Sequence, residues 1–206
     1  MLSNRIARLV APPRRVPLPL VCSALLGLTG ALGAIFFFVG MTVLWMSLSS
    51  PWVLLFSSVF SIVGAAFFIS ATAHGLEQVR LLRWGEVAST RSVSQHGTNT
   101  YVNDEPVIEY TYEFEGRDGR VHSGSSKALR KEEIGDEARE PVLYLPSNPE
   151  CSVLVDALPL RYTLDVDGAG QWVSYEGLWT IVWCCLAWAG VGVHVMYGLL
   201  RVLGVF

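Results

Sequence analysis

An uncharged run from Val16 to Ala73 constrains this chain more than any other feature of its sequence. A helix needs only ~20 residues to cross the hydrocarbon core of a bilayer, so the run is long enough for two crossings. The natural break lies at Ser47 to Pro51, because proline suits the first turn of a new helix. We therefore predict membrane spans at Leu18–Ser47 and Pro51–Ala73, joined by a tight turn.

The start of this run also admits a cleavable signal peptide. Its apolar stretch continues well past the ~7–15 residues of such a signal, which favours a retained membrane anchor. A third apolar stretch at Leu178–Leu200 predicts one more span. The predicted fold class is a membrane protein with an α-helical transmembrane bundle of three spans and a β module inserted before the last span.

The charged residues are concentrated between the second and third spans. All 18 acidic residues lie between Glu77 and Glu176, together with 10 of the 15 basic residues. Contacts to phosphate need lysine and arginine, so this acidic segment argues against nucleic acid as a partner. The partners that we expect are the lipid bilayer and either another protein or further copies of the chain in a homo-oligomer.

The orientation follows from the basic residues that flank the spans. Residues 1–17 form a basic arm with four arginines, and residues 74–85 predict a juxtamembrane helix extension that carries Arg80 and Arg83 and stops at Gly85. Short cytoplasmic flanks are enriched in lysine and arginine. We therefore expect a multi-pass protein of the cell inner membrane with its N-terminus and its β module in the cytoplasm. Arg201, in the tail at 201–206, opposes this orientation.

Residues 86–158 carry the signals of a small β module. Apolar and aromatic residues alternate with polar ones, which predicts a strand with one buried face; they are Val107, Ile108, Tyr110, Tyr112 and Phe114. The pair Asp118-Gly119 then suits a tight hairpin turn. A strand at 86–95 followed by a polar loop at 96–105, and strands at 141–145 and 151–155, complete the pattern. Five short strands predict a small antiparallel β-barrel-like or curled-sheet module.

These residues also carry a family resemblance. A passage of the form Y-x-Y-x-F-x-G…D-G-x-x-x-x-G, then G-D, then a strand ending Y-x-P-S-N-P-E, resembles the bacterial membrane family called domain of unknown function 3592. The matching positions are Gly85, Tyr110, Tyr112, Phe114, Gly119, Gly124, Gly135, Tyr144, Pro146, Asn148 and Pro149. The resemblance covers about a third of the chain and implies a membrane-anchored β module without an assigned activity. Leu145, where an acidic residue is common, and the insert before Tyr144 are departures.

Residues 159–177 predict a linker between the module and the third span. Asp165, Asp167 and Glu176 occupy the first, third and twelfth positions of a calcium loop, with glycine at the sixth. Alanine and valine stand at two further ligand positions, so a plain turn is preferred to a metal site. We interpret Trp172, Tyr175 and Trp179 as an aromatic belt at the membrane interface.

His194 is the one ionisable side chain inside a predicted span, which makes it a candidate functional residue. A hydrogen-bonded or interfacial histidine is preferred to a proton relay, because no span supplies an acidic partner. Small residues at helical spacing predict close packing of the first two spans; they are Ser23, Gly27, Ala31 and Ala34 in the first span and Ser57, Ser61, Gly64 and Ala65 in the second.

Sequence motifs of common enzymes do not occur in this chain. It has no GxSxG, no P-loop and no HExxH motif, and its four cysteines form no CxxC pair. The cysteines are interpreted as small buried apolar residues. No cofactor is expected, and an enzyme is the least supported class. The first hypothesis is a noncatalytic membrane protein whose β module serves protein interaction or assembly. The alternatives are an oligomeric transport or channel component that uses His194, or an immunity or envelope-stress protein.

Overall fold

The computed structural model describes residues 6, 8–46, 50–102, 105–128, 134, 139–158 and 163–204 of the chain. They form two compact units. The module unit consists of residues 1–20 and 77–175, and the helical unit consists of residues 21–76 and 176–206. Each unit is described separately.

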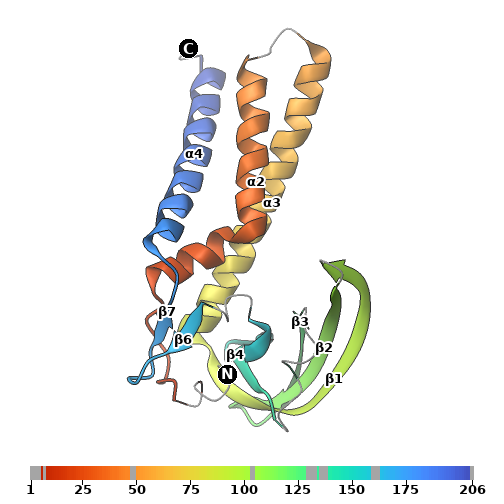
Figure 1. Cartoon of the computed structure of the whole chain (residues 1–206), viewed down its shortest axis with the longest axis vertical. Helices are drawn as coiled ribbons and strands as arrows, with labels where there is room; N and C mark the ends of the chain where they lie inside the picture. Colours follow the sequence, from red (N-terminus) through yellow and green to blue (C-terminus); the bar gives the residue numbers. More distant parts are fainter. Residues whose placement is uncertain are drawn as a thin grey trace. The chain divides into compact units, whose positions relative to one another are not determined.

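Three long helices account for the helical unit. They are α2 (Leu18–Met46), α3 (Pro51–Trp84) and α4 (Leu178–Val202), coloured red to orange, orange to yellow and blue in Figure 1. All three are long and apolar enough to cross a membrane. Large apolar side chains such as Phe56 and Ile62 are exposed along them, as lipid-facing positions require. The prediction of three membrane-spanning helices is thus consistent with the fold, and α3 begins at Pro51 as expected.

The first helix is not the single straight span that the sequence suggests. Gly27 has φ 47° and ψ −174°, which divides α2 into a short first segment and a longer second one. Figure 1 shows the corresponding change of direction within α2. Because side-chain-bearing residues rarely adopt this conformation, a glycine is required at the bend.

Close packing of α2 on α3 involves two glycines, Gly33 and Gly40, that the predicted small-residue pattern did not include. A Cβ added at Gly33 would lie 2.9 Å from the carbonyl oxygen of Gly64, and one added at Gly40 would lie 2.6 Å from the amide nitrogen of Ser61. Gly27, by contrast, has no atom within 4 Å of such a Cβ. The prediction for α3 is confirmed at Ser61 and Gly64. On α2 the contact is made by glycines that allow the two backbones to approach.

The module unit contains a five-stranded antiparallel sheet in the order β3-β2-β1-β4-β5. Its strands are β1 (Glu86–Val102), β2 (Glu105–Glu115), β3 (Val121–Ala128), β4 (Pro141–Leu145) and β5 (Asn148–Leu154). The predicted alternation is confirmed on β2, where Ile108, Tyr110, Tyr112 and Phe114 are buried. The loop predicted at 96–105 is wrong, because β1 continues to Val102. Threonines, Tyr101 and Val102 favour strand in that stretch.

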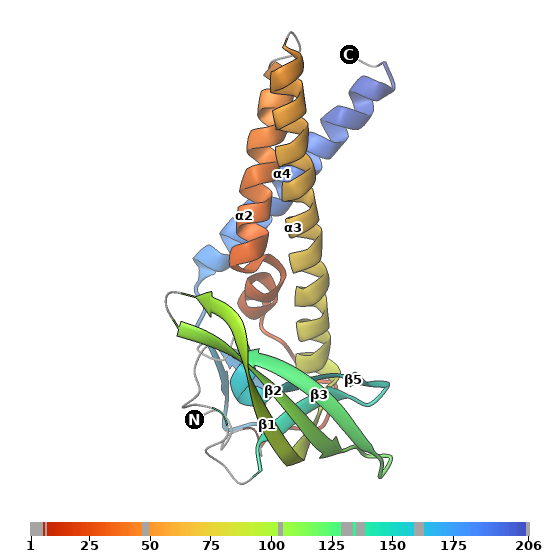
Figure 2. The same cartoon turned by 90° about the vertical axis from the view of Figure 1, so that its right-hand side faces the viewer.

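The two edges of the sheet meet, so that it is nearly closed (Figure 2). The Tyr112 hydroxyl lies 3.2 Å from the Ser152 hydroxyl of β5, and the Ser126 hydroxyl of β3 lies 3.3 Å from Tyr112. The backbone N–H of Leu154 donates to the same Ser126 oxygen at 3.2 Å. A Cβ at Gly124 would meet the Ser152 hydroxyl at 2.5 Å, so glycine permits the closure. The curled, barrel-like prediction holds, with side chains sealing the gap.

Two apolar cores lie on opposite sides of β4. Val142 and Tyr144 face the barrel core together with the aromatic residues of β2. Leu143 faces a second core that contains Leu82 of α3 and Val155 of the 3₁₀ turn η2 (Val155–Ala157). Both faces of β4 are therefore buried, which explains its continuous apolar run PVLYL.

The linker prediction for 159–177 is wrong for the residues described there. Residues Leu164–Val166 (β6) and Trp172–Ser174 (β7) form an antiparallel hairpin. Trp172 is buried in the second core and does not belong to an interfacial aromatic belt. Leu164 and Val166 pack into the same core, so their alternation marks a short strand that the sequence reading missed.

Candidate functional site

The C-terminal end of α3 is enclosed by segments from both ends of the module unit. A helix leaves its last four carbonyl groups without partners inside the helix. The Trp172 indole N–H donates to the carbonyl oxygen of Leu82 at 2.7 Å, and the backbone N–H of Arg14 donates to that of Arg83 at 2.9 Å. The N–H of Gly85 donates to Leu81 at 2.7 Å. We call this arrangement the helix-end collar, formed by residues 10–15 and 170–172.

Arg14 is the central side chain of the collar. It is buried, and its guanidinium donates to the carbonyl oxygens of Gly85 and Val10, each at 2.6 Å. Burial lowers the pKa of Arg14 from its usual value, and the nearby Glu86 carboxylate acts in the opposite direction. The interpretation of residues 1–17 as a basic arm is therefore wrong at Arg14. Its charge is used to bind carbonyl oxygens inside the module.

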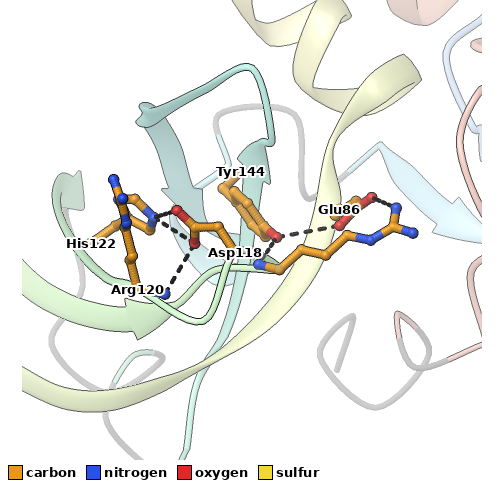
Figure 3. A network of polar contacts seen from close by, with 6 residues as sticks. Glu86, Asp118, Arg120, His122 and Tyr144 are labelled. Carbon is orange, nitrogen blue, oxygen red and sulfur yellow. Dashed lines mark hydrogen bonds and ion pairs between the residues drawn. The ribbon is translucent and has the colours of Figure 1, made fainter.

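A polar network lies where β1 begins, β4 ends and the β2–β3 turn passes (Figure 3). The backbone N–H of Arg117 donates to the Tyr144 hydroxyl at 2.9 Å, and this hydroxyl donates to Glu86 Oε2 at 3.3 Å. The guanidinium of Arg117 donates to Glu86 Oε1 at 3.2 Å. The side chain of Arg117 is 81% exposed, so the pair contributes little to stability.

The adjoining turn is held by Asp118. Its carboxylate accepts the N–H of Arg120 at 3.1 Å and lies 3.1 Å from His122 Nε2 (Figure 3). Both hydrogen bonds lower the pKa of the Asp118 carboxyl group, and the one from the Arg120 backbone has the larger effect. Gly119 has φ 71°, which explains the glycine of the predicted Asp118-Gly119 turn.

Two open hollows flank the network. One, of about 300 Å³, is lined by Arg117, Asp118, Tyr144, Pro146 and Pro149. The other, of about 480 Å³, is lined by residues of the 6–14 segment together with Glu86, Val87 and Arg117. The His122–Asp118 pair resembles part of a catalytic triad. In the described part of the chain no serine or cysteine is hydrogen-bonded to His122, and the His122–Asp118 contact spans the β2–β3 turn.

The outer edge of β1 is the other notable feature of the module. Strand β4 pairs with β1 only from Glu86 to Ser89, whereas β2 pairs with it as far as Val102. From Ser92 to Tyr101, β2 is thus the one strand neighbour that β1 has among the described residues. We call this stretch the outer edge. Between Arg91 and Asp104 it contains no acidic or basic residue other than His96, and Tyr101 is 67% exposed.

The acidic residues of the calcium-loop pattern are engaged as hydrogen-bond acceptors. Asp165 accepts the Val166 N–H and the Tyr175 hydroxyl, each at 2.8 Å. Asp167 accepts the N–H groups of Ala169 and Gln171 at 2.9 and 2.8 Å. Within the described residues, no cluster of three or more histidine, cysteine or acidic side chains could hold a metal ion. These contacts fit the plain turn.

His194 lies in the helical unit, against aromatic side chains of α2. Its Nδ1 is 3.0 Å from the carbonyl oxygen of Gly190, one turn earlier in α4. Its ring centroid lies 6.2 Å from that of Phe37 and 5.4 Å from that of Phe38. The geometry is that of a histidine packed between α2 and α4 and hydrogen-bonded within its own helix.

Most of the family-motif residues occupy structural positions. Tyr110, Tyr112, Phe114 and Tyr144 are in the barrel core. Gly85 follows the end of α3, where a Cβ would meet the Leu143 side chain at 2.8 Å. Pro146 lies in the turn between β4 and β5, and Asn148 and Pro149 begin β5. Gly135 lies outside the described residues. The motif positions that the structure describes thus have structural roles.

Sequence reasoning missed the collar and the Glu86–Arg117 pair. Arg14 stands beside Arg15 in an arginine pair, and no pattern separates the buried member from the exposed one. The one available signal is Trp172, whose large side chain in a presumed linker indicates a buried position.

No known protein family matches this chain, and neither curated proteins nor solved structures show a significant similarity to it. The resemblance to domain of unknown function 3592 therefore stays a prediction.

Proposed function

We propose that this chain is a noncatalytic integral membrane protein whose β module binds a protein partner along the outer edge of β1. The observation that carries the proposal is the length of β1, which runs for 17 residues although β4 covers only its beginning. The spans serve to hold the module at a membrane.

Fold stability gives little reason for the far end of this strand. Beyond Gly97, β1 pairs with a part of β2 that has no β3 partner among the described residues, and a two-stranded ribbon is marginally stable in water by itself. From Ser94 to Tyr101 every residue of β1 except Thr98 is exposed. The far end of β1 is thus long but buries few of its side chains. This suggests that it serves a contact with another molecule.

The chemistry of the edge favours strand addition by a partner. Natural edge strands are commonly protected by charged side chains or proline, because unpaired backbone groups recruit other strands. The outer edge has neither protection. A partner segment that pairs here would gain backbone hydrogen bonds along the strand, with Tyr101 as an aromatic contact.

The polar groups of the module support a noncatalytic role. Glu86, Arg117 and Tyr144 contact one another, and Asp118 is occupied by the turn. The described residues thus offer no activated nucleophile beside the hollows. We also propose that the protein resides in a bacterial inner membrane with the module in the cytoplasm.

The test is site-specific photocrosslinking in intact cells. A photoreactive phenylalanine analogue replaces Tyr101 on the outer edge or, as a control, Val121 on β3, which is also exposed. We expect a discrete protein adduct from position 101 and none from position 121. Adducts to lipid alone, or an identical pattern from both positions, would contradict the proposal.

A matched pair of lysine substitutions tests the edge itself. Ser94 and Thr111 are directly paired on β1 and β2, so their side chains lie on the same face of the sheet. Ser94→Lys adds a charge to the outer edge, whereas Thr111→Lys adds it to a strand with neighbours on both sides. We expect S94K to reduce the position-101 adduct at least tenfold and T111K to leave it nearly unchanged. Equal effects would show that general surface charge, and not the edge, determines binding.

A further inference from the structure

The last turn of α4 carries a basic side chain that is far from every acidic side chain of the helical unit. Arg201 lies in that turn, whereas all acidic residues of the chain lie between Glu77 and Glu176. Only Glu176 belongs to the helical unit, and the 25 residues of α4 place it roughly 35 Å from Arg201 along the helix. All of the acidic residues precede α4, so a membrane that α4 crosses separates them from Arg201.

Arg201 packs on an aromatic pair that joins α4 to α2. Its guanidinium carbon lies 5.4 Å from the centroid of the Trp45 ring, in the last turn of α2. Tyr197, one turn earlier in α4, contacts the same indole edge-on, with 4.9 Å between the ring centroids and 83° between the ring planes. Stacking uses the flat face of a guanidinium and leaves the N–H groups at its edge available as donors.

The indole of Trp45 adds a second donor to this place. Its Nε1 atom is buried and has no hydrogen-bond partner. A buried indole N–H usually finds an acceptor, because an unpaired donor in apolar surroundings costs free energy. Arg201 and Trp45 thus bring two kinds of N–H donor together at one end of the helical unit.

We propose that Arg201 and Trp45 bind the phosphate of an anionic phospholipid where α2 and α4 end. Arginine binds phosphate through parallel N–H···O hydrogen bonds, and tryptophan favours the headgroup level of a bilayer. The acyl chains of the lipid lie along α4, most of whose apolar surface is exposed. A lipid therefore suits the site better than a free anion. This role also accounts for Arg201, the basic residue that opposes the predicted orientation, and it is independent of the outer edge of β1.

Native mass spectrometry of the full-length protein in detergent tests the site. The probes are phosphatidylglycerol and phosphatidylcholine with the same acyl chains. We expect one tightly bound phosphatidylglycerol per chain and weaker binding of phosphatidylcholine, whose amine neutralises the phosphate. Arg201→Gln should lower the affinity for phosphatidylglycerol about tenfold, because it removes charge-assisted hydrogen bonds. Equal affinity of the wild-type protein for the two lipids would overturn the proposal.

Arg91→Gln is the control for charge, because it removes an exposed arginine that is paired with Glu115 in the module unit. R91Q should bind phosphatidylglycerol as the wild type does, and an equal loss in R91Q and R201Q would overturn the proposal. R201K keeps the charge without the planar fork, so its affinity should fall between those of the wild type and R201Q. This order tests the site even where R201Q is unstable.

Two further measurements define the ligand and the second donor. Trp45→Phe keeps an aromatic face for Arg201 and removes the N–H, so the affinity should fall about threefold. An unchanged affinity in W45F would overturn the assignment of Trp45. Inorganic phosphate at millimolar concentration should leave the lipid bound, because it lacks the acyl chains. Complete displacement by inorganic phosphate would assign the site to a free anion and overturn the lipid.

Discussion

Arg14 donates a hydrogen bond of 2.6 Å from its guanidinium Nη1 to the carbonyl oxygen of Gly85, 71 residues further along the chain. The contact lies at the end of α3, where the helix leaves carbonyl groups unpaired. A charged donor in a buried position makes a stronger hydrogen bond than a neutral one, and its removal leaves a buried acceptor without a partner.

The collar predicts a large difference between two adjacent arginines. Arg14→Ala should destabilise the module unit by about 2–3 kcal/mol, because it removes charge-assisted hydrogen bonds to buried carbonyl groups. Arg15→Ala removes the same charge from an exposed side chain and should cost less than about 0.5 kcal/mol. The stability of both variants is measured by thermal unfolding in detergent, which is monitored by near-ultraviolet circular dichroism. Equal losses would mean that the collar is not a structural element.

The sheet is closed where β3 meets β5, and we call this contact the seam. It depends on the small size of one residue, Gly124. Gly124→Ala should cost about 1–3 kcal/mol, since its Cβ would press on the Ser152 hydroxyl and the Tyr112 ring. Gly97→Ala is the matched control, because no atom lies within 4 Å of a Cβ there. Denaturant unfolding and hydrogen exchange at β3 compare the two variants. An unaffected G124A protein would show that the seam is open in solution.

Alkaline pH should weaken the module. Burial raises the pKa of the Tyr112 hydroxyl above its ordinary value, so the folded state binds that proton more tightly than the unfolded state. This tighter proton binding contributes to the free energy of unfolding. The contribution is complete below the unfolded-state pKa near 10, and it is lost as pH rises through the higher folded-state pKa. Tyr112→Phe should cost about 1 kcal/mol at neutral pH and reduce the alkaline loss. Phenolate absorbance measured beside circular dichroism tests this. Ionisation of Tyr112 at an ordinary pKa, before any loss of structure, would contradict it.

The bend in α2 predicts a specific glycine requirement. Gly27→Ala should destabilise the helical unit by about 1–3 kcal/mol, because alanine does not tolerate the observed φ of 47°. Gly192→Ala in α4 has equal room for a Cβ and no positive φ, and should be neutral or slightly stabilising. Unfolding in detergent compares the free energies of unfolding of the two variants. A stable G27A protein with a continuous helix, seen by spin-label distances, would refute the bend.

The proposed orientation predicts which engineered cysteines react from outside the cell. In a background without cysteines, Asn99→Cys on β1 should resist a membrane-impermeant maleimide in intact cells, whereas Leu203→Cys beyond α4 should react. Both sites react after the cells are opened, which controls for burial. Labelling at 99 and not at 203 would reverse the orientation and direct the search for partners to the other side of the membrane.

Sequence patterns specified the local elements well and their distant contacts poorly. The uncharged run and Pro51 located α3, and the alternation through Tyr110 and Tyr112 identified the buried face of β2. Both are short-range signals with a fixed period. Arg14 and Trp172 acquire their roles from partners many residues away, which periodicity does not encode. The bend at Gly27 was missed because glycine is common in membrane helices, where it also serves close packing.

The collar also fixes an order of assembly during synthesis. Trp172 closes on Leu82 from a position 90 residues later in the chain. At roughly 5–20 residues per second, the end of α3 waits several seconds for that indole group. The hairpin that carries it ends only a few residues before α4, which begins at Leu178. The base of the module is therefore completed while the last span enters the bilayer, so that a chain truncated before residue 172 would leave the ribosome with an unfinished domain.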